Sequence, residues 1–135
     1  MSIPIIWFLI DDDPDDREIF LLTIDRINKP IDCQVAKDGI EALEKLKIDT
    51  FNPDCIILDL NMPFMDGRQC LIEIKAIERL NKTPVFIYST SSEPMFKEEL
   101  KQLGATGYIV KPSSIALLGD ILTDLYQKIE NNMAA

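Results

Sequence analysis

Five polar residues stand directly behind apolar runs, where a chain that forms a parallel sheet would expose them. Asp11 and Asp12 follow a run of six apolar residues, and Asp59 follows CIIL. Ser89 follows VFIY, and Lys111 follows GYIV. A carboxylate in such surroundings can act as a nucleophile toward phosphorus, and a nearby cation offsets charge on the transferring oxygens. These residue types therefore indicate phosphoryl transfer, provided that the fold brings them together.

Gathered carboxylates need positive charge around them. Two like charges about 4 Å apart repel by roughly 4 kcal/mol at an effective dielectric of about 20, so Asp11, Asp12 and Asp59 would raise a pKa or recruit a cation. Lys111 supplies one positive charge. A divalent ion suits the remainder, because Mg²⁺ prefers carboxylate oxygens, water and phosphate. Zinc is disfavoured, since the sequence has no histidine and no thiol stands at these positions.

Each of these residues also has a purely structural interpretation. Asp13, Asp15 and Asp16 suit the start of a helix, where a side chain caps backbone N–H groups and acids favour the macrodipole; Asp13 is the best candidate for a cap. A single aspartate such as Asp59 after a strand can be a turn residue, and Lys111 alone would be a solvated charge. What favours a functional site is that all four strand ends carry such residues together.

The elements that must position these groups alternate between apolar runs and helical patterns. Such alternation predicts an α/β domain with a parallel sheet and helices on both faces. The second strand alternates apolar and polar residues, which is typical of an edge strand with one wet face. In open α/β sheets, sites lie beyond the carboxyl ends of the strands. The predicted strands are Ile5–Ile10, 31–35, 55–58, 85–88 and Gly107–Val110.

Helical spacing of apolar residues predicts five helices, with Gly104 ending the fourth and the chain fraying after Glu130. The side chains predicted to face the core are Phe20, Ile24 and Ile27 in the first helix, Ile40, Leu43 and Leu46 in the second, Cys70, Ile74 and Ile77 in the third, Phe96, Leu100 and Leu103 in the fourth, and Leu118, Ile121, Leu122, Leu125 and Ile129 in the fifth.

Length and composition restrict the class of protein. The 135 residues fit a single domain, 1–135, with a net charge of −9 that argues against nucleic-acid binding. The apolar start is too short to cross a membrane and lacks a basic flank, so no membrane association is predicted. Three widely spaced cysteines, Cys33, Cys55 and Cys70, suit a core with reduced thiols and a cytoplasmic location.

Four motifs in this order resemble the receiver domain of two-component response regulators. The resemblance covers nearly the whole chain, and it implies a flavodoxin-like, doubly wound, five-stranded parallel sheet with strand order 2-1-3-4-5. The motifs are IDDD at residues 10–13, LDLNMPFMDG at 58–67, YST at 88–90 and GYIVKP at 107–112.

The resemblance implies a role for each site residue. Asp59 matches the phosphoacceptor, and Lys111 matches the lysine that contacts the phosphoryl group. Asp11 and Asp12 match the acidic pair that holds Mg²⁺, with Asp12 as the direct ligand and Asp11 acting through water. Asn61 matches the residue that offers its backbone carbonyl to the metal. Because three acids stand where two are usual, the register of the pair could slip by one.

Four further positions take roles from the same resemblance. Ser89 matches the switch hydroxyl that moves toward the phosphoryl group, and Tyr108 matches the switch aromatic that turns inward. Thr90 completes the hydroxyl-bearing motif. Pro112 matches a residue that family members often join through a cis peptide bond, which is a costly conformation that needs a reason.

The implied function is that of a phosphorylatable switch without multiple turnover. It would accept the phosphoryl group from a sensor histidine kinase or a phosphotransfer protein in a Mg²⁺-dependent reaction. With no output domain expected, it would signal by docking to another protein, and the face of the fourth helix, fifth strand and fifth helix could also form a homodimer. The DDDP opening and the slightly long segments 28–30 and 78–83 resemble those of stand-alone regulators, including regulators paired with phytochrome-type kinases.

Three alternatives remain at this point. A pseudo-receiver would bind partners without phosphorylation, although such domains usually lose a site residue. A phosphotransfer enzyme of the haloacid-dehalogenase type would need a second aspartate where Asn61 stands. A flavodoxin-like cofactor binder would need a hydroxyl- and glycine-rich phosphate loop after the first strand, where this chain has three aspartates that would repel phosphate.

Overall fold

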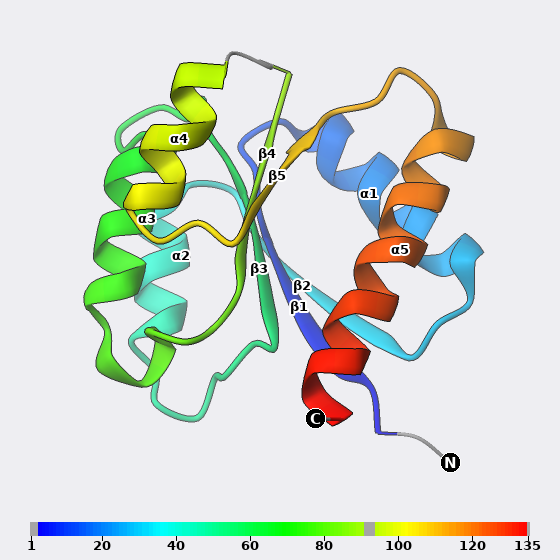
Figure 1. Cartoon of the computed structure of the whole chain (residues 1–135), viewed down its shortest axis with the longest axis horizontal. Coiled ribbons are helices and arrows are strands. Elements are labelled where there is room, and N and C mark those ends of the chain that lie inside the picture. The colour runs from blue at the N-terminus through cyan, green and yellow to red at the C-terminus, as the bar shows by residue number, and fades with distance from the viewer. Residues whose placement is uncertain (1–2, 91–93, 135) are drawn as a thin grey trace.

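Five strands form one parallel sheet in the order β2-β1-β3-β4-β5 (Figure 1). The structure is a computed structural model that describes residues 3–90 and 94–134. The order and direction of the strands confirm the predicted doubly wound, flavodoxin-like α/β fold. The strands are β1 (Ile5–Ile10), β2 (Ile31–Ala36), β3 (Cys55–Asp59), β4 (Val85–Ser89) and β5 (Gly107–Val110).

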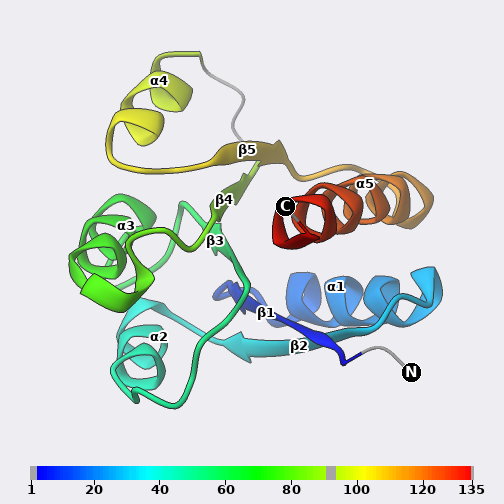
Figure 2. The ribbon, with the colours of Figure 1, turned by 60° about the horizontal axis from the view of Figure 1, so that its bottom comes forward.

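Helices cover both faces of this sheet, as Figure 2 shows from a second direction. On one face α1 (Pro14–Ile27) packs against α5 (Ile115–Ala134). On the other face lie α2 (Gly39–Leu46), α3 (Gly67–Ala76) and α4 (Pro94–Gln102). A short 3₁₀ helix, η1 (Glu78–Leu80), connects α3 to β4. The sheet therefore separates two hydrophobic cores.

The burial of the strands follows from their sequence patterns. All five residues of β3 are buried, and β1 is buried except for one half-buried residue, which fits two continuous apolar runs covered on both faces. In the edge strand β2 exposed residues alternate with half-buried ones, as its period of two predicts. The side chains of β1 that point to opposite faces, such as Trp7 and Phe8, enter different cores.

Several predicted details differ from the structure. Ile40 is 46% exposed, and Ala42 takes its expected place in the core beside Leu43. The predicted fraying after Glu130 is wrong, since α5 continues to Ala134. A formed helix is easily extended, because each new hydrogen bond requires only one more residue to be fixed. The side chain of Phe96, predicted to face the core, lies outside the described part of the structure.

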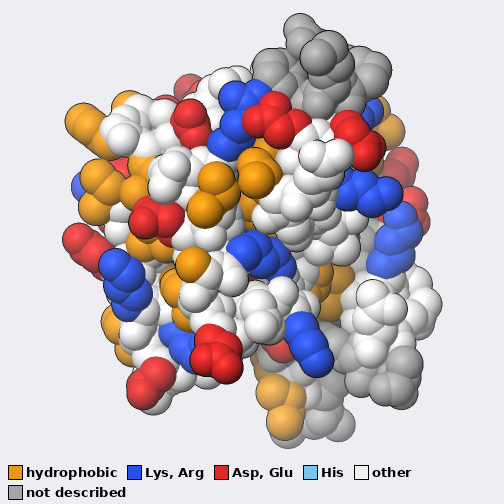
Figure 3. Space-filling model, turned by 60° about the vertical axis from the view of Figure 1, so that its left-hand side comes forward, with side chains coloured by type: hydrophobic (Ala, Val, Ile, Leu, Met, Phe, Trp, Pro, Cys, Tyr) orange, Lys and Arg blue, Asp and Glu red, His pale blue; other side chains and the backbone are white. Residues whose placement is uncertain are grey.

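The outer surface of helices α2, α3 and α4 is chemically mixed. Figure 3 shows hydrophobic side chains among acidic and basic ones on this face. The exposed hydrophobic residues include Ile40 on α2 and Ile72 on α3. Among the described residues, none of the helices combines the length and the apolar character that crossing a bilayer requires.

Gly67 is placed where a side chain would strike the backbone that carries Asp59. Its N–H donates a hydrogen bond to the Leu60 carbonyl over 2.8 Å. A Cβ atom added to Gly67 would lie 2.6 Å from the Asp59 carbonyl oxygen and 2.7 Å from the Leu60 Cα atom. The start of α3 can therefore approach the end of β3 this closely only because residue 67 has no side chain.

We expect Gly67→Ala to lower the free energy of unfolding by about 1–3 kcal/mol, because the backbone around Asp59 must shift to make room. Chemical denaturation of the two proteins measures the difference. Gly119→Ala, in α5, is the matched control, since a Cβ atom there would make ordinary contacts of 3.7 Å with Ile27 and 3.9 Å with Thr23 of α1. That control should gain about 0.5–1 kcal/mol from helix propensity. Equal stability of Gly67→Ala and the wild type would contradict the predicted clash.

Candidate functional site

The carboxyl ends of the strands bring the sequence-predicted residues to one edge of the sheet. Asp59 and Ser89 are the last residues of β3 and β4. Each of these strands is one residue longer than predicted, because the predicted strands end at residues 58 and 88. Asp11 and Lys111 directly follow β1 and β5. The Lys111 N–H donates a hydrogen bond to the Ser89 carbonyl over 2.8 Å, which extends the β4–β5 pairing to the lysine itself.

Three carboxylates gather at this edge. Asp11, Asp12 and Asp59 each offer one oxygen, and these oxygens all lie within 4.8 Å of one another. Asp11 is fully buried, Asp59 is 5% exposed and Asp12 is half-buried. The Asp13 N–H donates to Asp11 Oδ1 over 3.0 Å and so fixes the orientation of the buried carboxylate. The crowding that the sequence predicts for these three residues is present.

Asp13 stands outside this cluster and caps α1, as predicted. Its Oδ1 atom accepts hydrogen bonds from the N–H groups of Asp15 and Asp16 at 2.9 Å and 3.4 Å. Asp13 is exposed. The possible slip of the acidic pair by one residue therefore finds no support in the geometry, since Asp11 and Asp12 are the residues that face Asp59.

The Lys111 ammonium group lies among these acids. Its Nζ atom is 3.0 Å from Asp11 Oδ2, 3.7 Å from Asp59 Oδ1 and 2.8 Å from Asp16 Oδ2. It also lies 5.1 Å from the centre of the Tyr88 ring, a distance that allows a cation–π contact. From the sequence alone, Asp16 is predicted only as an acid at a helix start. The cap at Asp13 was the available signal, because it places Asp16 in the first helical turn beside the sheet edge.

The surroundings of Asp59 and Lys111 raise the pKa of both groups, for different reasons. Burial raises the pKa of Asp59 to about 7, and the charge of Asp11 adds to the rise, while Lys111 and the Asn61 N–H act in the lowering direction. Burial by itself would lower the pKa of Lys111, but hydrogen bonds from its ammonium group to Asp16 and Asp11 hold that pKa above its ordinary value. Without a further cation, the site holds more negative charge than Lys111 can offset.

The loop after β3 stays close to Asp59. The Asn61 N–H donates to Asp59 Oδ1 over 3.4 Å, and the Asn61 side chain is exposed. Phe64 is 87% exposed and has a φ of 67°, a left-handed conformation that non-glycine residues seldom adopt. Asp66 then caps α3 by accepting a hydrogen bond from the Gln69 N–H over 3.0 Å. This loop carries Asn61 next to the carboxylates.

The two predicted switch residues differ in exposure. Ser89 is fully buried at the end of β4. Tyr108 is half-buried in β5, and the Lys97 ammonium lies 5.4 Å from the centre of its ring. Thr90 is exposed and is the last residue described before the gap at 91–93.

The expected cis peptide bond before Pro112 is absent. The bond between Lys111 and Pro112 is trans, and the described residues contain no cis peptide bond. A trans bond before proline needs no special support, because it is favoured by about 0.5–1 kcal/mol.

The chain matches the response regulator receiver domain over residues 7–123, which is most of its length. It belongs to that family. Receiver domains are the signalling switches of two-component systems, and they accept a phosphoryl group. The predicted resemblance is therefore confirmed at the level of the family.

Two curated relatives show how far the likeness of this receiver domain extends. Chemotaxis protein CheY-3 of Vibrio cholerae is 36% identical over 96 residues, which cover 71% of this chain and 72% of that protein. Protein-glutamate methylesterase/protein-glutamine glutaminase 1 of Methanospirillum hungatei is 36% identical over 121 residues, which cover 86% of this chain. The matched part is only 35% of the length of the methylesterase.

Two solved structures resemble the receiver domain in fold. The phosphorylated cyanobacterial phytochrome response regulator RcpA has a TM-score of 0.82 and 29% identity, covering 90% of this chain and 91% of RcpA. The Mn²⁺-bound form of response regulator Rcp1 has a TM-score of 0.71 and 26% identity, covering 95% of this chain and 91% of Rcp1.

The raised pKa of Asp59 predicts how the stability of the receiver domain depends on pH in EDTA. Between about pH 4 and pH 7 the folded protein holds a proton on Asp59 that the unfolded chain releases, so ionisation of this group destabilises the fold as pH rises. Asp59→Asn removes that cost. We expect the variant to become more stable than the wild type by a margin that grows through this window, by at most about 1.4 kcal/mol per pH unit.

Urea denaturation of both proteins from about pH 5 to pH 8 measures this margin. Above about pH 7 the margin should level off, because Asp59 is then ionised in both folded and unfolded states. Millimolar Mg²⁺ should reduce it by stabilising the ionised wild type. A difference in stability between the two proteins that does not change with pH would contradict the raised pKa of Asp59.

Proposed function

We propose that Asp59 is the residue on which this receiver domain accepts the phosphoryl group. The observation that carries the proposal is the cluster of Asp59 with Asp11 and Asp12, whose oxygens lie within 4.8 Å of one another, beside the Lys111 ammonium. Asp59 sits at the end of the central strand β3, and it keeps 5% of its surface open to solvent. It is therefore reachable by a donor and is surrounded by the charges that the reaction needs.

The chemical step is a displacement at phosphorus. An ionised Asp59 oxygen attacks the phosphorus of a donor, a P–O bond to Asp59 forms, and the bond from phosphorus to the leaving group breaks. The leaving group departs with the electron pair, as acetate does from acetyl phosphate or imidazole from a phosphohistidine. Lys111 offsets charge on the phosphoryl oxygens, and Ser89 donates a hydrogen bond to the aspartyl phosphate.

The donor set fits a magnesium ion. Asp11, Asp12 and Asp59 supply hard carboxylate oxygens, and the sequence offers no histidine to compete for a softer metal. Asp12 would bind directly, Asp11 through water, and Asn61 through its backbone carbonyl. When bound, the ion offsets negative charge on the phosphoryl group and the carboxylates. The similar regulator Rcp1 has a Mn²⁺-bound form, which supports the proposal that this chain also binds a divalent ion.

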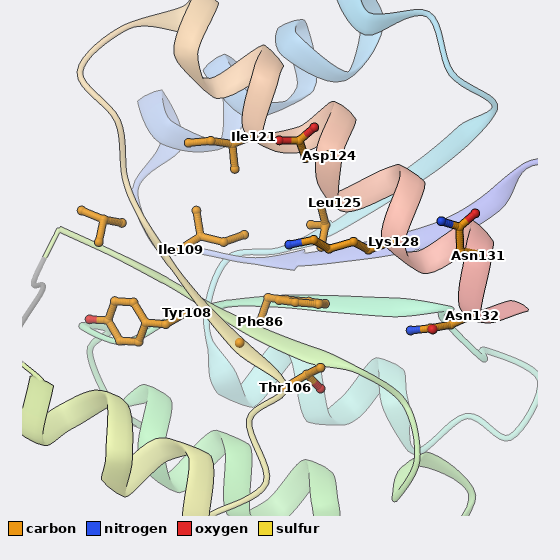
Figure 4. A pocket seen from close by; sticks show the side chains of 12 residues that line it. Phe86, Thr106, Tyr108, Ile109, Ile121, Asp124, Leu125, Lys128, Asn131 and Asn132 are labelled. Atoms are coloured by element: carbon orange, nitrogen blue, oxygen red, sulfur yellow. The ribbon is translucent and has the colours of Figure 1, made fainter.

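The donor partner would be a sensor histidine kinase or a phosphotransfer protein, and the output would be docking to a downstream protein. A groove of about 780 Å³ lies between β5 and α5, and Figure 4 shows the side chains that line it. Hydrophobic side chains, among them Phe86, Ile109 and Leu125, lie in it beside the polar Lys128 and Asp124. This groove belongs to the face of α4, β5 and α5, which supports docking of the downstream protein or of a second copy there.

Tyr108 is placed where a change in its conformation on phosphorylation of Asp59 would alter this face. It lines the groove beside α5 and also a smaller groove of about 260 Å³ beside α4. A rotation of its ring, coupled to a movement of Ser89, would change the shape of both grooves. The domain would act as a switch rather than as a multiple-turnover enzyme. Its three cysteines form no disulfide, which suits a cytoplasmic location.

The proposal is tested by intact mass spectrometry after incubation with acetyl phosphate. We expect one phosphoryl group per chain in the presence of Mg²⁺ and almost none in EDTA. Uptake that is equal in EDTA would contradict the metal dependence. The pseudo-receiver alternative would be favoured if the protein took up no phosphoryl group under either condition and if acetyl phosphate did not change its binding to partner proteins.

A further inference from the structure

The shortest of the three ion pairs of the Lys111 ammonium is made to a residue outside the carboxylate cluster. Its Nζ atom lies 2.8 Å from Asp16 Oδ2 and 3.0 Å from Asp11 Oδ2, both of which are hydrogen-bond distances. The distance to Asp59 Oδ1 is 3.7 Å, too long for a hydrogen bond. In this structure Lys111 is therefore held toward α1 and makes only an ion pair with the proposed phosphoacceptor.

We propose that Asp16 is a positioning residue that holds Lys111 away from Asp59 before phosphoryl transfer and thereby slows phosphoryl uptake. The proposal rests on the proposed function of Asp59 and adds a means by which the chain sets its own rate. A move of Lys111 toward the incoming phosphoryl oxygens draws its ammonium group away from Asp16, and the cost of weakening that hydrogen bond enters the barrier of the reaction.

Asp16 differs from Asp11 in how readily it can release the lysine. The Asp11 side chain is fully buried, so a loss of Lys111 would leave a buried charge uncompensated. The Asp16 side chain is 34% exposed in the first turn of α1. Water can replace the ammonium there, and the helix N-terminus favours the negative charge. Asp16 is thus the partner that Lys111 can leave at lower cost.

The phosphorylated state supplies the competing attraction. A phosphoryl group on Asp59 carries about two negative charges, whereas Asp16 carries one. Because Lys111 already lies 3.7 Å from Asp59, a rotation of its flexible side chain is enough to change partners. The ion pair with Asp16 therefore opposes the reaction before transfer. After transfer, the attraction of Lys111 to the phosphoryl group exceeds its attraction to Asp16.

The test compares three variants by rates of phosphoryl uptake over a range of acetyl phosphate concentrations in saturating Mg²⁺. Asp16→Asn removes the charge, and we expect its maximal rate constant to rise about three- to tenfold with little change in the half-saturating concentration. Asp16→Glu keeps the charge and should stay near the wild type. Asp15→Asn is the matched control, because it removes an exposed acid from the same helical turn without touching Lys111.

Each result decides the proposal. An Asp16→Asn rate equal to or below that of the wild type overturns it, as does an equal rise in Asp15→Asn, which would indicate a general effect of net charge. If Asp16→Asn does not fold, Asp16→Ser is used with the same expectation. Absence of uptake by the wild type would instead contradict the proposed function of Asp59. Normal wild-type uptake with no effect at Asp16 would contradict only the role of Asp16.

Discussion

Asp59→Asn should lose phosphoryl uptake from acetyl phosphate by more than about 100-fold, because the amide that replaces the carboxylate is a poor nucleophile. The substitution keeps the size of the side chain at the end of β3. It also removes one of three crowded negative charges, so the fold should become more stable rather than less. Mass spectrometry of the intact protein in Mg²⁺ measures the uptake.

The control for this experiment is Asp49→Asn, which changes an exposed aspartate beyond α2 in the same way. That variant should take up phosphoryl groups at the wild-type rate. Asp59→Asn that is folded and still labelled would contradict the assignment of the phosphoacceptor. Loss of labelling in both variants would show that net charge, and not residue 59, controls the reaction.

Lys111→Met should destabilise the metal-free protein by about 2–4 kcal/mol at about pH 8. The Lys111 side chain is 12% exposed and lies within 4 Å of three carboxylates, one of which is fully buried. Methionine fills similar space but leaves the carboxylates without their ammonium partner. Urea denaturation in EDTA measures the loss of stability.

The electrostatic origin of this loss can be separated from packing. Near pH 5 the loss should be smaller, since Asp59 with a pKa of about 7 is then protonated. Lys82→Met, at an exposed position, should change stability by less than about 0.5 kcal/mol. A Lys111→Met loss that is the same at both pH values would indicate lost packing instead of lost charge compensation.

The sequence was sufficient to predict what depends on short-range pattern. Apolar runs covered on both faces located β1 and β3, and the polar residues after them had to meet at one edge because parallel strands share their direction. Asp11, Asp12, Asp59 and Lys111 were all expected at this edge, and the structure places them there. Asp13 was expected to cap α1, and it does.

What the sequence did not reveal depends on three-dimensional detail. The contact of Asp16 with Lys111 joins residues 95 positions apart and requires the rotation of α1 about its axis to be known. Ile40 follows the helical period but lies at the N-terminal end of α2, where it is 46% exposed. The trans bond before Pro112 could not be read from a motif, because proline permits both isomers.

The central claim is that crowded carboxylates and a divalent ion make Asp59 the phosphoacceptor, and chemical trapping tests it most directly. Borohydride reduces an aspartyl phosphate to homoserine, which peptide mass spectrometry can locate in the sequence. After acetyl phosphate and Mg²⁺, we predict homoserine at position 59 and none when EDTA replaces Mg²⁺. Homoserine at Asp11 or Asp12, or equal trapping in EDTA, would contradict the account.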